Sequence, residues 1–138
     1  MTLSRDQLQK LLDSHFPNSG IAVDAVGKGS VRLRQVAGDG HLRPGGTVLG
    51  PVQMALADTA VYLALIGTGR PFKAAVTSSL HISFLRRPPP GALSAHGRLV
   101  KIGSRLAVGE VYLHGPDDED APVAQATVTY ALPPAADD

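Results

Sequence analysis

Hydrophobic positions recur at helical spacing in two segments of the chain. In Ser4–Ser14 the leucines share one face and Ser4 suits the N-cap, which predicts an amphipathic helix. Pro51–Ile66 predicts a second helix, because a proline suits the first turn and Gly67 suits the helix exit. This second helix is apolar around most of its circumference, so we expect other elements to enclose it.

Apolar residues alternate with polar or small ones in six further segments, which is the two-residue period of a β-strand. Gly27–Ser30 lies between the first two segments, which are therefore expected to form a hairpin. Three prolines in Arg86–Gly91 end the third strand, Gly38–Gly50 is a glycine-rich loop, and residues 133–138 are expected to fray. The six expected strands are Ile21–Val26, Val31–Val36, Ala74–Leu85, Ala92–Ile102, Arg105–His114 and Pro122–Leu132.

The order of these elements predicts an α+β fold in a single domain spanning residues 1–138. Short connections favour antiparallel neighbours, so one curved antiparallel sheet is expected to wrap around the central apolar helix. The N-terminal helix is an addition to this arrangement. A small wrapped sheet leaves edge strands exposed, which favours pairing with a second copy of the chain.

Composition narrows the class of protein. Of the 138 residues, 43% are hydrophobic and 18% are charged, which excludes a disordered or fibrous chain. The chain has no cysteine, and this excludes disulfides, a thiol nucleophile and thiolate metal ligands. The five histidines show no metal-ligand spacing, so no metal site is expected. We find no signal-peptide pattern, and Val48–Gly69 is too interrupted to span a membrane, so we expect a cytoplasmic protein without a membrane partner.

The formal net charge of +1 conceals an uneven distribution. Residues 40–109 contain eight basic residues and one acidic residue, a formal charge of +7. This pattern is typical of a surface that meets an anion, although a solvated basic face gives the same pattern. Nucleic acid is not the expected partner, because the chain has few aromatic stacking platforms and no recognition motif. The eight basic residues are Arg43, Arg70, Lys73, Arg86, Arg87, Arg98, Lys101 and Arg105.

Asp58 is the one acidic residue of that segment, and it falls on the apolar second helix. A buried carboxylate without a partner costs several kcal/mol, so Asp58 either lies at an opening onto a polar site or is an ion-paired structural group. The loop before the helix, Arg43–Pro51, is rich in glycine. Glycines allow close backbone approach, and the N–H groups of a helix N-terminus can stabilise an oxyanion. Alternatively, this segment is a flexible surface loop.

Two motifs carry a resemblance to a known family. Gly46–Pro51 followed by Ala55–Ala60 resembles the hotdog-fold acyl-CoA thioesterases of the phenylacetate-pathway, or PaaI-like, group, which have His-Gly-Gly and then Ala-Asp-Thr-Ala at this spacing. Thr77–Arg86 resembles the strand that follows in that family, and Lys101–Ala107 resembles its Lys-x-Gly-(Lys/Arg) turn. The resemblance runs from Arg43 to Tyr130 and implies a hotdog fold.

The resemblance implies that the protein is an acyl-CoA or aryl-CoA thioesterase. Asp58 takes the position of the catalytic carboxylate, which acts as nucleophile or as general base toward water. Gly50 takes the position of the glycine whose N–H polarises the thioester carbonyl. Thr77 matches a hydroxyl residue that, in some relatives, positions water from the neighbouring subunit. The active site implied is therefore expected to need a homodimer or a dimer of dimers.

Substrate contacts are implied for Arg43, Leu49 and Thr59, and no cofactor is expected beyond the CoA of the substrate itself. Arg43 stands where relatives have an amide, Leu49 where they have the motif histidine, and Pro51 where they have its second glycine. These departures bear on substrate and rate more than on fold. The CoA phosphates need basic groups and backbone donors, and the residues expected to supply them are Arg86, Lys101, Gly103, Ser104 and Arg105.

Two other functions are compatible with the same residues. Loss of the motif histidine and of the amide fits a non-catalytic, regulatory hotdog protein that binds acyl-CoA. A hotdog dehydratase is less expected, because no histidine of that kind precedes the second helix. Hydrolysis of a thioester remains the leading hypothesis.

Overall fold

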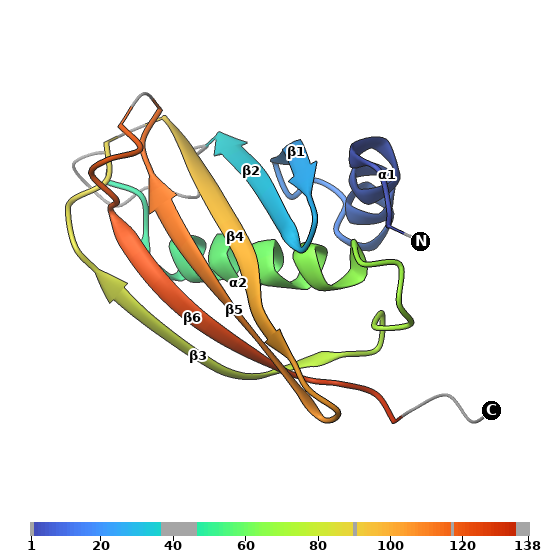
Figure 1. The fold of residues 1–138 in the computed structure, drawn as a ribbon. Helices are drawn as coiled ribbons and strands as arrows, with labels where there is room; N and C mark the ends of the chain where they lie inside the picture. Colours follow the sequence, from blue (N-terminus) through green and yellow to red (C-terminus); the bar gives the residue numbers. More distant parts are fainter. Residues whose placement is uncertain (1, 37–46, 90, 117, 135–138) are drawn as a thin grey trace.

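The computed structural model describes residues 2–36, 47–89, 91–116 and 118–134. Its six strands form one antiparallel sheet in the order β1-β2-β4-β5-β6-β3, and the sheet curves around helix α2 (Figure 1). This confirms the α+β fold with a wrapped central helix and an additional N-terminal helix. The elements are α1 (Arg5–His15), β1 (Ile21–Gly27), β2 (Ser30–Val36), α2 (Gly50–Ile66), β3 (Val76–Phe84), β4 (Ala92–Ile102), β5 (Leu106–His114) and β6 (Ala124–Ala131).

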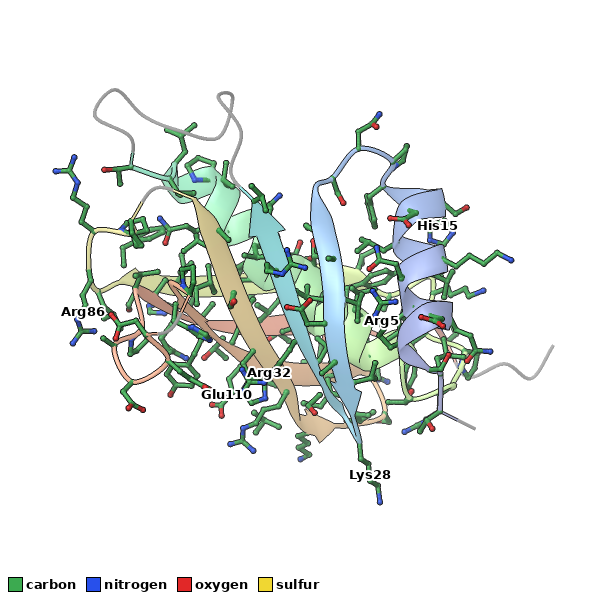
Figure 2. The ribbon with its side chains drawn as sticks, turned by 90° about the horizontal axis from the view of Figure 1, so that it is seen from above. Arg5, His15, Lys28, Arg32, Arg86 and Glu110 are labelled. Atoms are coloured by element: carbon green, nitrogen blue, oxygen red, sulfur yellow. The ribbon has the colours of Figure 1, made fainter. Side chains whose placement is uncertain are left out.

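Helix α1 covers one edge of the sheet. It begins with a capping box, in which the Ser4 hydroxyl accepts from the Gln7 N–H and the Gln7 side chain accepts from the Ser4 N–H. Gln9 accepts from the Val23 N–H at 2.7 Å and donates to the Ile21 carbonyl at 3.3 Å. Figure 2 shows Arg5 beside β1, where its Nε donates to the Val23 carbonyl at 2.7 Å. The helix thereby satisfies backbone groups that an edge strand leaves unpaired.

Helix α2 lies close against β4 and β5 because glycines face it there. A Cβ at Gly97 would come within 3.0 Å of the Ala60 Cβ, and one at Gly109 within 2.8 Å of a Val61 methyl. The helix is not enclosed on every side, contrary to the expectation from its apolar sequence. One stripe remains partly or fully accessible, because no described strand covers it, and it comprises Pro51, Met54, Ala55, Asp58, Thr59 and Tyr62.

Strand β3 forms the other edge of the sheet, and no described helix covers its free side as α1 covers β1 (Figure 1). It pairs with β6 rather than with β4, which follows it in the sequence. In this pairing Thr77 lies opposite Tyr130, next to an irregularity of register between Thr77 and Ser79. Val76, at the start of the strand, has 62% of its surface exposed. No helix in the described part of the chain combines the length and apolar character needed to cross a membrane.

Candidate active site

The Asp58 side chain emerges from the accessible stripe of α2 and is held by two hydroxyl groups. The Tyr130 hydroxyl lies 2.6 Å from Asp58 Oδ1, and the Thr77 hydroxyl lies 2.9 Å from Oδ1 and 3.2 Å from Oδ2. None of the described salt bridges includes Asp58. Of the two alternatives for this residue, the described structure therefore favours an opening onto a polar site over an ion-paired structural group.

The sheet explains why both donors reach one carboxylate. Thr77 on β3 and Tyr130 on β6 are cross-strand partners, and the side chains of such partners project from the same face of a sheet. The Tyr130 ring stacks on Tyr62 of α2, with ring centroids 5.8 Å apart and planes inclined by 28°. Tyr62 in turn donates from its hydroxyl to the Lys73 carbonyl at 2.8 Å. The site thus joins α2 to the far edge of the sheet.

Both tyrosines keep their protons at neutral pH. Burial raises the pKa of Tyr130 far above its usual value, and the Asp58 carboxylate that accepts its hydrogen bond raises this pKa further. Burial also raises the pKa of Tyr62. Tyr130 is therefore a permanent hydrogen-bond donor toward Asp58 across the physiological range of pH.

Asp58 faces a cavity of about 640 Å³ between α2, the end of α1 and the start of β3. Its lining is mainly apolar, with a few polar groups, a combination that is common in sites for small organic molecules. Thr59 also lines this cavity, although its hydroxyl donates to the Ala55 carbonyl at 2.8 Å. The apolar and aromatic part of the lining is Leu12, Phe16, Ile21, Ala55, Tyr62, Ala75, Val76 and Tyr130.

Gly50 and Leu49 lie at the other end of α2, outside the lining of this cavity. Gly50 precedes Asp58 by eight residues, which corresponds to about 12 Å along a helix axis. The ring of Phe84 lies over Gly50, and a Cβ built there would meet its Cζ at 3.4 Å. Within one chain, the structure therefore brings together Asp58, Thr77 and Thr59 but not Gly50. Arg43, a predicted substrate contact, lies outside the described residues.

The residues predicted to bind CoA do not gather in one place on a single chain. Lys101 is the penultimate residue of β4, and Gly103, Ser104 and Arg105 form the turn into β5. Arg86 follows β3 at the opposite end of the sheet, where it donates to the Pro122 carbonyl at 2.7 Å. The eight-residue strand β6 separates the two ends by about 25 Å. Figure 2 shows Arg86 apart from Lys28, which lines one surface hollow together with Lys101.

Sequence reasoning missed the two tyrosines of the site. Tyr62 lies four residues after Asp58 on the accessible stripe, so its place beside the carboxylate was readable from helical spacing. Tyr130 is 72 residues from Asp58, and its contact with the carboxylate depends on how β6 packs against α2, for which the sequence holds no local signal. Among the described residues, no three His, Asp or Glu side chains converge as metal ligands.

The architecture and the carboxylate-bearing helix define a class of hotdog proteins, and comparison with known proteins gives the family. Residues 45–122 match the family model described as the thioesterase superfamily, and the chain belongs to this family. No curated protein matches the chain.

Three solved structures illustrate the likeness. A candidate thioesterase from Silicibacter sp. TM1040 is 40% identical, with a TM-score of 0.86 and coverage of 96% of this chain and 93% of that one. A phenylacetic acid degradation-related candidate thioesterase from Ralstonia eutropha JMP134 is 27% identical, with a TM-score of 0.76 and coverage of 91% and 98%. The protein smu.793 from Streptococcus mutans UA159, solved bound to acetyl CoA, is 27% identical, with a TM-score of 0.72 and coverage of 86% and 91%. These likenesses confirm the hotdog fold and the PaaI-like resemblance.

Proposed function

We propose that this protein hydrolyses an acyl-CoA or aryl-CoA thioester to the free acid and CoA, with Asp58 as the reacting carboxylate. The observation that carries the proposal is the placement of Asp58: a single carboxylate, oriented by two hydroxyl donors, at the wall of a mainly apolar cavity. Membership of the thioesterase superfamily and the acetyl CoA bound to the S. mutans neighbour support the same reaction.

The Asp58 carboxylate acts in one of two ways. As a general base it takes a proton from water while the water oxygen bonds to the thioester carbonyl carbon. As a nucleophile it bonds to that carbon itself, and water then hydrolyses the resulting anhydride. In both routes the tetrahedral adduct collapses, the C–S bond breaks, and the CoA thiolate leaves and is protonated.

The substrate class follows from the walls of the cavity. Burial of apolar surface contributes about 25 cal/mol per Å², so the mainly apolar lining favours an aliphatic or aromatic acyl group over a charged one. A carboxylate at the far end of the acyl chain would find no described cation among the lining residues. We therefore assign the cavity to an uncharged acyl or aryl group and place the CoA moiety outside it.

A second copy of the chain completes the proposed site. The unprotected β3 edge supports antiparallel pairing of two chains, since an exposed edge strand is a ready template for another strand. Pairing of this kind sets opposite ends of two sheets side by side, so that Gly50 of one chain can approach Asp58 of the other. It would also bring Arg86 of one chain toward the turn at Lys101–Arg105 of the other, next to one CoA molecule.

The test is thiol release from a panel of acyl-CoA and aryl-CoA esters by the wild type and by Asp58→Asn. We expect the variant to lose on the order of 10²-fold or more in kcat, because a catalytic group is removed. Asp24→Asn is the matched control, because Asp24 is an exposed carboxylate on β1 that pairs with Arg34 on β2. An unchanged rate in Asp58→Asn would refute this mechanism.

The departures at Leu49 and Arg43 support one alternative function, a non-catalytic protein that binds acyl-CoA. The same panel distinguishes the two functions. If calorimetry shows that the wild type binds CoA esters, but no thiol is released from aliphatic or aromatic esters, then the function is acyl-CoA binding and not hydrolysis.

A further inference from the structure

Tyr130 is a buried tyrosine whose hydroxyl points at the Asp58 side chain. Resting on the function proposed above, we infer that Tyr130 is a positioning residue that fixes the rotation of the Asp58 carboxylate. The family motifs do not include this residue, and neither composition nor spacing singles it out.

The contacts of the hydroxyl carry the inference. It lies 2.6 Å from Asp58 Oδ1 and 3.1 Å from the backbone carbonyl oxygen of the same residue. A hydroxyl has one proton, and the shorter contact to a charged acceptor is the stronger hydrogen bond. The 3.1 Å approach to the backbone carbonyl oxygen shows that β6 lies close against this turn of α2. Tyr130 therefore holds the side chain of Asp58 and packs against its backbone.

The two carboxylate oxygens of Asp58 have different hydrogen-bond contacts. Oδ1 is within hydrogen-bond distance of both Tyr130 and Thr77, whereas Oδ2 has the longer 3.2 Å contact with Thr77. Oδ2 consequently keeps more free lone-pair capacity than Oδ1. We assign Oδ2 as the oxygen that meets water or the thioester carbon, and Oδ1 as the oxygen that anchors the group.

The support behind Tyr130 is rigid. Tyr130 has only 4% of its surface exposed and stands on β6, which is paired on both sides, by β5 and by β3. Its ring is stacked on Tyr62, so the hydroxyl has little freedom to move away from Asp58. The raised pKa of Tyr130, caused first by burial, keeps the proton on the donor. A group built this way orients a carboxylate at low entropic cost during the reaction.

Tyr130→Phe tests the inference, because it removes the hydroxyl and leaves the ring to stack and fill the core. We expect kcat for a CoA ester to fall roughly 10- to 100-fold with KM changed less than about twofold, since a charged hydrogen bond is lost from the reacting group and not from the substrate.

Tyr112→Phe is the matched control, because it makes the same chemical change on β5 at a residue that is 43% exposed and outside the cavity. It should leave both kcat and KM unchanged. Thermal unfolding of both variants shows whether each remains folded. If Tyr130→Phe folds and keeps the wild-type kcat, the hydroxyl has only a structural role and the inference is wrong.

A measurement that needs no turnover separates this inference from the proposed function. At one fixed neutral pH, the carboxyl ¹³C resonance of Asp58, identified by its loss in Asp58→Asn, should change its chemical shift in Tyr130→Phe, because the carboxylate loses its shorter hydrogen bond. An unchanged chemical shift overturns the inference even if the enzyme is a thioesterase. A changed chemical shift together with full activity of Asp58→Asn retains the positioning role and overturns the proposed reaction instead.

Discussion

A carboxylate on an otherwise apolar helix is stable only where polar neighbours replace the water it loses. At Asp58 these neighbours are neutral hydroxyls, whereas the described salt bridges involve other residues. A nearby cation would neutralise the charge and compete with substrate or water for the carboxylate. Hydroxyl donors stabilise the charge while leaving it free to accept a proton or to attack carbon.

Thr77 supplies the second of these donors, and its contribution can be separated from its bulk. Thr77→Val keeps the shape of the side chain and removes the hydroxyl, so Asp58 loses a donor to both oxygens. We expect kcat to fall by about tenfold or more, as for a lost hydrogen bond to a charged group. Thr77→Ser keeps the hydroxyl and should stay within about threefold of the wild type. Equal rates for the Val and Ser variants in a thiol-release assay would remove Thr77 from the mechanism.

At this scale the sequence led to the carboxylate and, through the family resemblance, to Thr77, but not to Tyr130. Asp58 could be singled out because it is the one acidic residue between positions 40 and 109 and lies on an apolar helix. Tyr130 could not, because a tyrosine within an alternating apolar strand is a common core residue. Its role depends on the packing of β6 against α2, which brings its hydroxyl to Asp58.

At the scale of elements, α1 supplies hydrogen-bond partners for the edge backbone of β1. Gln9 contacts the N–H of Val23 and the carbonyl of Ile21, two groups that a neighbouring strand would otherwise satisfy. Leu8 and Leu12 of α1 are buried in the core. The N-terminal helix is therefore part of the sheet's hydrogen bonding as well as of its packing, and through Leu12 and Phe16 it also closes one side of the cavity.

Gln9→Ala tests how much the pairing of these backbone groups contributes to the free energy of unfolding. We expect a loss of about 1–3 kcal/mol in the free energy of unfolding, measured by urea denaturation, because a partly buried donor and acceptor lose their partners. The neighbouring exposed Lys10→Ala is the control and should change stability by less than about 0.5 kcal/mol. If the two variants are equally stable, α1 holds the sheet by its leucines alone.

Helices and strands were predictable within a few residues, whereas the neighbours of each strand were not. Alternation gave Ala74–Leu85 where the structure has β3 at Val76–Phe84, and Pro122–Leu132 where it has β6 at Ala124–Ala131. Periodicity reports which face of a strand is buried, and it contains nothing about which strand lies beside it. The pairing of β3 with β6 is a property of the whole sheet, and it is this pairing that creates the site.

At the scale of the whole molecule, the two edges of the sheet differ. Helix α1 covers the β1 edge, whereas no other described strand pairs with the free side of the nine-residue strand β3. An exposed edge strand favours pairing with another strand. The proposed reaction favours the same pairing, because Gly50 and Asp58 lie about 12 Å apart along α2 and are both assigned to one thioester.

Gly50→Pro removes the N–H that the proposal assigns to the thioester carbonyl. Leu49, with φ −62° and ψ 143°, already has the extended conformation that suits a residue before proline, and Gly50 begins the helix, where proline is tolerated. Gly50→Ala is the matched control, since it adds a Cβ before Pro51 but keeps the N–H. We expect kcat of the Pro variant to fall by roughly 10²-fold relative to the Ala variant, as for a lost oxyanion donor. Similar rates for the two would exclude this N–H from catalysis.

Mixing two inactive variants asks whether the Gly50 N–H and the Asp58 carboxylate of one site come from different chains. In a mixed dimer of Gly50→Pro and Asp58→Asn, a shared site that takes each group from the other chain has one intact copy, whereas a site within one chain has none. After unfolding and refolding together at equal amounts, half of the dimers are mixed, so we expect about one quarter of the wild-type activity to return. Co-purification of an untagged variant with a tagged one shows that mixed dimers form. If mixed dimers form and no activity returns, each chain carries its own complete site and the 12 Å separation along α2 must be bridged in another way.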